Sequence, residues 1–69
     1  MNAQTQIAEY QNEIVRLMRS NDYCNEMILN NQTKNWERKE YQDVIDENNQ
    51  EIKLTKAIIE RIKRIYPNG

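Results

Sequence analysis

Side chains that could carry acid–base or nucleophilic chemistry are scarce in this sequence. It has no histidine, one cysteine at Cys24, and one glycine at Gly69. General acid–base catalysis most often uses histidine, and a phosphate-binding loop needs glycines at its turn. No nucleophile stands beside a base at a catalytic spacing. The sequence therefore predicts a protein that is not an enzyme and holds no cofactor.

A group of carboxylates is the feature closest to a metal site. The acids concerned are Glu40, Asp43, Asp46, Glu47 and Glu51. Asp43 and Glu47 are four residues apart, which places them on one face of a helix. Di-metal centres in ferritin-like bundles use inward carboxylates together with Glu-x-x-His partners, and this chain lacks the histidine. We expect a solvated acidic face and no metal.

Cys24 cannot form a disulfide within the chain, because it is the only cysteine. Nothing around it indicates the electropositive, exposed setting of a reactive thiol, so we expect a small buried hydrophobic side chain. The 69 residues form one domain, residues 1–69. A domain this small seldom buries enough apolar surface without a disulfide or a metal, so we expect oligomerisation or a partner.

Two heptad runs organise the chain. Their steps alternate between three and four residues, the spacing that keeps one stripe of an α-helix facing a partner. The predicted core positions are Ala3, Ile7, Tyr10, Ile14, Leu17, Asn21, Cys24 and Ile28 in the first run, and Tyr41, Ile45, Asn48, Ile52, Thr55, Ile59, Ile62 and Tyr66 in the second. The predicted fold is all-α: a long antiparallel helical hairpin, or two-helix coiled coil. Apolar runs are too short for a membrane span.

The predicted helices cover residues 4–30 and 36–66, with a turn at 31–35. Asn35 is the expected N-cap of the second helix and Thr33 the alternative. The second helix ends before Pro67, which disfavours helix in the residue preceding it. The segment Ser20–Asp22 favours caps and turns, so a three-helix arrangement broken at Asp22 is the alternative, although the heptad phase runs through it unchanged.

The loop also predicts how the helices pair. A turn centred near residue 34 places Asn21 opposite Asn48 in the same core layer. One asparagine opposite an isoleucine would leave an unmatched amide, at a cost of about 1–3 kcal/mol. Two facing asparagines can hydrogen-bond, so the pair penalises slipped registers.

Apolar residues also lie beside the core positions, Val15 among them. A four-helix bundle needs such a widened stripe, so two hairpins are predicted to dimerise. The predicted dimer face is Val44, Ile58, Ile65, Met18 and Met27. The alternative is that this face binds a different protein. The pattern does not choose between parallel and antiparallel dimers.

Charge is unevenly distributed. Residues 53–69 hold five basic residues and one acid, a net charge of +4, whereas residues 1–52 have a net charge of −5. A basic helix end can bind phosphates, so nucleic-acid binding is the alternative function. It would use Lys53, Lys56, Arg61, Lys63 and Arg64. The structural explanation is that these cations suit a helix C-terminus and face Glu9 and Glu13.

Trp36 and Tyr23 fall off the core positions and are candidate anchors for a protein partner. Their charged neighbours Glu37 and Arg19 complete the predicted protein-binding set. The alternative is structural, with Trp36 closing the apolar end of the hairpin under the loop.

The predicted function is a non-enzymatic protein-binding module, a cytoplasmic regulator or inhibitor that occludes a target protein. A self-assembling scaffold is a further alternative. Abundant Asn, Ile and Lys, whose codons are AT-rich, indicate a bacterium or one of its phages. In size and predicted topology the chain resembles the plasmid-encoded RNA-binding hairpin dimers of the Rop type. It shares no motif with them, so the resemblance implies architecture and not function.

Overall fold

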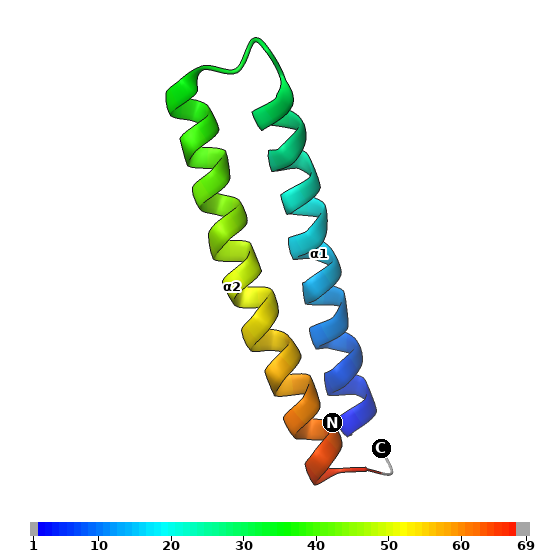
Figure 1. Ribbon diagram of the computed structural model, residues 1–69. Coiled ribbons are helices and arrows are strands. Elements are labelled where there is room, and N and C mark those ends of the chain that lie inside the picture. The colour runs from blue at the N-terminus through cyan, green and yellow to red at the C-terminus, as the bar shows by residue number, and fades with distance from the viewer. Residues whose placement is uncertain (1, 68–69) are drawn as a thin grey trace.

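Two long helices form an antiparallel hairpin (Figure 1). The computed structural model describes residues 2–67, so Met1, Asn68 and Gly69 of the predicted domain lie outside the described residues. Helix α1 spans Ala3–Leu29 and helix α2 spans Asn35–Ile65, joined by a loop at residues 30–34. Both predicted helices are therefore confirmed, each starting and ending one residue earlier than expected.

Helix α1 begins at an asparagine cap and runs unbroken. The Asn2 Oδ1 accepts a hydrogen bond of 2.8 Å from the Thr5 N–H, which satisfies one of the free amides of the first turn. No break occurs at Asp22, so the three-helix alternative is wrong. The reason lies in Asn21, whose side chain bonds across to α2 and so does not compete for its own helix backbone.

The helices face each other along the predicted heptad positions. The buried core positions are Ala3, Leu17, Cys24, Ile45, Thr55 and Ile59, and nearly all the others are half-buried. Tyr66 is the exception, since its side chain is 57% exposed. Helix α2 ends at Ile65 because Pro67 disfavours helical geometry at Tyr66. The Tyr66 side chain therefore does not continue the row of core residues.

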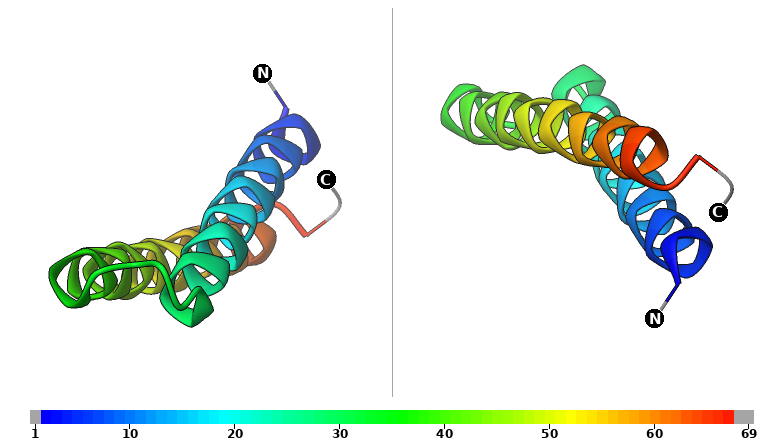
Figure 2. Two further views of the ribbon diagram at one scale, coloured as in Figure 1. Left: turned by 90° about the horizontal axis from the view of Figure 1, so that it is seen from above. Right: turned by 90° about the horizontal axis from the view of Figure 1, so that it is seen from below.

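Viewed along its length, the hairpin shows α1 and α2 crossing at an angle (Figure 2). The molecule is a rod of 50 × 15 × 14 Å with the loop at one end and the first turn of α1 and last turn of α2 at the other. Neither α1 nor α2, as described over residues 2–67, combines the length and apolarity needed to cross a membrane.

A polar layer interrupts the apolar core near its middle. The Asn48 Nδ2 donates to the Asn21 Oδ1 at 2.9 Å and is also 3.1 Å from the Ser20 Oγ. The predicted pairing of the two asparagines is therefore confirmed. The layer is larger than predicted, because the Asn21 Nδ2 donates in turn to the Asn49 Oδ1 at 2.9 Å. Both polar atoms of the Asn21 side chain are thus satisfied by α2.

An arginine fastens the loop end of the hairpin. The Arg38 Nε donates to the Ile28 carbonyl and its Nη2 donates to the Asn30 carbonyl, each at 3.0 Å. The last carbonyls of a helix have no hydrogen-bond donor within the helix, and the helix dipole is negative at that end. The Arg38 guanidinium supplies both hydrogen-bond donors and a positive charge at the C-terminus of α1. We call this set of contacts the Arg38 clasp.

The N-cap of α2 is Lys34, so the predictions of Asn35 and of its alternative Thr33 are wrong. The Glu37 Oε1 accepts from the Lys34 N–H at 3.1 Å, which ties the first turn together without a capping side chain. The Asn35 Oδ1 instead accepts from the Arg38 Nη1 at 3.0 Å and helps to hold the clasp. Thr33 is a buried residue of the loop.

Candidate functional site

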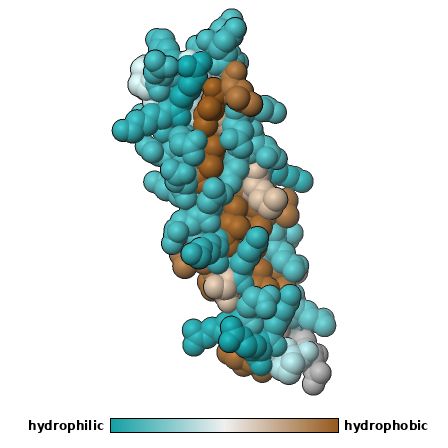
Figure 3. All heavy atoms as spheres, in the orientation of Figure 1, coloured by the Kyte–Doolittle hydropathy of each residue, from teal (hydrophilic) through white to brown (hydrophobic). Residues whose placement is uncertain are grey.

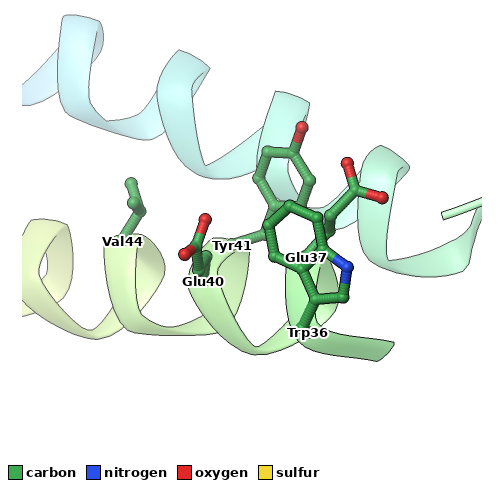
Figure 4. Close-up of a pocket in the computed structure, with 5 residues that line it drawn as sticks. All are labelled: Trp36, Glu37, Glu40, Tyr41 and Val44. Atoms are coloured by element: carbon green, nitrogen blue, oxygen red, sulfur yellow. The ribbon is translucent and has the colours of Figure 1, made fainter. Parts of the chain in front are cut away.

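The candidate site is a hollow on α2 next to the loop end. It has a volume of about 230 Å³ and is lined by Trp36, Glu37, Glu40, Tyr41 and Val44. All five side chains rise from the first turns of α2, and Tyr41 reaches toward α1 (Figure 4). The heptad pattern directs Tyr41 to the core, while Trp36 and Glu40 lie on the outer surface of the helix. We call this feature the Trp36 hollow.

The indole of Trp36 is 61% exposed, so it does not close the end of the hairpin. The structural alternative for this residue is therefore wrong. At this end of the hairpin, Thr33 of the loop is buried and the Arg38 guanidinium binds the Asn30 carbonyl. A tryptophan kept in water at a hollow is free to contact another molecule.

Tyr41 connects the hollow to α1. Its ring meets the ring of Tyr23 edge-to-face, with centroids 6.2 Å apart and an interplanar angle of 77°. Partial burial raises the pKa of Tyr41, and the neighbouring Tyr23 and the Glu37 carboxylate act in the same direction. Tyr41 therefore remains a neutral phenol at physiological pH. Its ring links Trp36 to the exposed ring of Tyr23, so the aromatic surface spans both helices.

The four residues predicted to bind protein do not form one cluster. Trp36 and Glu37 line the hollow, and Tyr23 adjoins it through Tyr41. Arg19 is exposed on α1, outside the hollow. Part of Glu37 is engaged in holding the Lys34 N–H, which makes it a structural residue as well as a lining residue. From the sequence, Glu40 was predicted in the acidic face and Val44 in the dimer face, and neither was grouped with Trp36, although their spacing from Trp36, four and eight residues, could have shown the grouping.

Apolar side chains continue from the hollow along α2. Val44, Leu54, Ile58 and Ile65 are 38–58% exposed, and we call them the outer stripe. The face of the molecule in Figure 3 shows hydrophobic atoms in a broken band along the rod, with hydrophilic side chains between them. Much of the apolar surface of this hairpin therefore remains in water.

The residues predicted to form one dimer face are divided between two sides of the hairpin. Met18 lies in a second hollow together with Asn49 and Lys56. Asn49 is about 140° around the axis of α2 from Val44, because each residue advances the helix by about 100°. Met27 is half-buried. Met18 is therefore separate from the outer stripe, which lies on α2 alone.

The five cations of the basic end are exposed but do not share one face. Lys56 and Arg61 lie about 140° apart around the helix. The expected pairing with α1 is not formed, since the Glu13 carboxylate is bound by Arg16 within α1 and no ion pair among residues 2–67 joins the two helices. The second pair, Lys63 with Glu60 at 3.8 Å, lies within α2. Lys53 and Arg64 are exposed as well.

The acidic side chains and Cys24 are placed as the sequence predicts. The acids Glu40, Asp43, Asp46, Glu47 and Glu51 are all exposed. Cys24 is buried at 4% exposure, so it is a core side chain. Within residues 2–67 no group of three or more histidine, cysteine or acidic side chains is placed to hold a metal ion.

Comparison of the chain with protein-family models, with curated proteins and with solved structures finds no match.

Proposed function

We propose that this protein is a non-enzymatic protein-binding module, a small cytoplasmic regulator or inhibitor that occludes a target protein. The supporting observation is the Trp36 hollow, where an indole 61% exposed stands beside Tyr41 and Val44. Tryptophan and tyrosine are over-represented among the residues that dominate binding energy. Burying one such ring on a partner removes a large apolar area from water.

We propose further that two hairpins associate into a four-helix bundle. Large apolar residues at 38–58% exposure along the outer stripe support this, because single exposed apolar residues are ordinary, whereas several that share one helix face indicate an interface, even with Glu51 between Val44 and Ile58. The few buried core residues of one hairpin support it too, since so small a core seldom stabilises a chain alone. The dimer would present its Trp36 hollows to the target.

Replacing Trp36 by alanine is expected to weaken capture of the target at least about tenfold, the ordinary effect of removing a tryptophan anchor. The measurement is pull-down from bacterial lysate with tagged wild-type and variant protein, quantified by mass spectrometry. Gln50→Ala, at an exposed position of α2, is the matched control and should capture as much as wild type. Circular dichroism should show equal helicity in all three proteins, because the indole is exposed.

Nuclease treatment separates this function from nucleic-acid binding. Capture that survives nuclease and depends on Trp36 supports the protein-binding module. Capture that disappears with nuclease and weakens steeply with added salt would assign the function to the basic end of α2 instead. Equal capture by the Trp36→Ala variant and wild type would overturn the role of the hollow.

A further inference from the structure

The outer stripe repeats with the period of a helix that packs on another helix. Ile58 and Ile65 are seven residues apart, Val44 lies fourteen before Ile58, and Leu54 lies four before it. Such spacing keeps side chains on one face of α2, which is the face that α1 leaves exposed. An extended helix is the shape that this stripe can accept along its whole length.

The charges beside the stripe change sign along the helix. Glu37, Glu40 and Glu47 flank its first half, whereas Arg61 and Arg64 flank its end. Among residues 2–67, neither Arg61 nor Arg64 takes part in an ion pair. A partner helix on the stripe would be electrostatically complementary to α2 if its charges ran in the opposite order. Its basic end would then lie on the acidic half of the stripe, and its acidic end on the basic half.

We infer that the partner of the outer stripe is a second copy of this chain, packed antiparallel through α2 about a twofold axis near Glu51. In this arrangement Glu40 lies opposite Arg61 of the second copy, and Val44 lies opposite Ile58. The order of charges along one helix is reversed in the other, so the stripe is complementary to itself. A twofold interface also makes every such contact twice.

This inference rests on the proposal that two hairpins associate through the outer stripe, and it adds their orientation and register. The Trp36 indole then lies at the rim of the dimer near Ile65 of the second copy, with its outer face open to a target. Two Glu51 carboxylates approach at the axis, which costs some stability.

A dimer shifted by one heptad is the main competing arrangement. It would place Leu54 opposite Leu54 of the second copy and Val44 opposite Ile65. It would also leave Glu40 beyond the end of the partner helix. Each register sets one isoleucine opposite a glutamate, Ile58 opposite Glu51 in the shifted dimer and Ile65 opposite Glu37 in the proposed one, so that mismatch does not separate them. The Glu40–Arg61 pairing favours the axis near Glu51, because only that axis brings together the acidic and basic ends of the stripe.

Charge reversal tests the pairing. Glu40→Arg and Arg61→Glu are each expected to raise the dimer dissociation constant roughly tenfold, because two attractive pairs become repulsive. The double variant Glu40→Arg/Arg61→Glu is expected to recover the wild-type value. Sedimentation equilibrium at low salt measures all four proteins. Lys53→Glu, which changes charge on another face of α2, is the control and should leave the constant unchanged.

Cysteine cross-linking tests the axis. In a Cys24→Ala background, Glu51→Cys is expected to form a disulfide-linked dimer on oxidation, whereas Leu54→Cys is not, since the two Leu54 residues lie about 10 Å apart along the axis. Cross-linking through Leu54→Cys alone would assign the shifted register and overturn this one.

A wild-type protein that remains monomeric up to about 1 mM, or a double charge variant that fails to recover, would also overturn the inference. Neither result would affect the Trp36 hollow, because Trp36-dependent capture of a target is measured separately. Conversely, loss of target capture with the dimer intact would reject the proposed function and leave the twofold pairing standing.

Discussion

Replacing Arg38 by alanine is expected to lower the free energy of unfolding by about 2–3 kcal/mol, because three charge-assisted hydrogen bonds are lost together. The Ile28 carbonyl is partly buried in the folded hairpin and would lose its donor without gaining full access to water. Urea unfolding followed by circular dichroism, at one fixed protein concentration, measures the change.

Two variants make this test specific to the clasp. Arg38→Lys keeps the positive charge near the C-terminus of α1 but cannot span both carbonyls and Asn35, so it should recover less than half of the loss. Arg19→Ala removes an exposed arginine of α1 and should change the free energy of unfolding by at most about 0.5 kcal/mol. An Arg38→Ala protein as stable as wild type would show that water replaces the guanidinium.

Replacing Asn48 by isoleucine is expected to destabilise the hairpin by about 1–2 kcal/mol. The substitution removes the donor to the Asn21 Oδ1 and to the Ser20 Oγ, and sets an apolar side chain against both. The cost stays moderate because Asn21 is only half-buried and its amide still reaches Asn49.

The double variant Asn21→Ile/Asn48→Ile is expected to be more stable than wild type, since it converts a polar layer into an apolar one. It should also lose the preference for a single register, seen as broadened signals in an NMR spectrum. A single Asn48→Ile variant that is more stable than the double variant would show that the two asparagines do not depend on each other. Thermal unfolding of the wild type, the two single variants Asn21→Ile and Asn48→Ile, and the double variant completes the cycle.

The helices, their antiparallel order and the asparagine pairing could all be predicted, because they follow from one periodic pattern and one short loop. The alternation of three and four residues defines which side chains face inward. The loop then limits the pairing to one register, and Asn21 meets Asn48 as a result. Tyr66 departs from the pattern because the proline after it acts on the backbone and not on the periodicity.

The Arg38 clasp was missed, although the sequence held a signal for it. Arg38 lies seven residues before Ile45, so it occupies a core position of the heptad pattern, next to the loop. A charged residue in a core position beside a helix C-terminus can serve the free carbonyls of that helix. Which carbonyls it reaches depends on the path of the loop, and periodicity says nothing about that path.

The exposure of Trp36 could not be predicted for a related reason. Its place off the heptad positions was clear, but whether the loop folds over it depends on what else fills the space below. In the structure Thr33 is buried and the Arg38 guanidinium binds the Asn30 carbonyl at that end, while Trp36 is exposed. Likewise, Met18 was grouped with Val44 because linear spacing does not tell which edge of α1 meets which edge of α2.

The clasp also has a consequence for the mechanics of the chain. The first and last helical turns lie at the same end of the rod (Figure 1), so a force that pulls the termini apart would peel α1 from α2 layer by layer. The apolar layers near the termini would separate first, and the polar layer, roughly halfway along, would separate after them. The clasp, which joins residues only ten apart in sequence, would yield last, and on release it would re-form first because the loop it closes is the shortest.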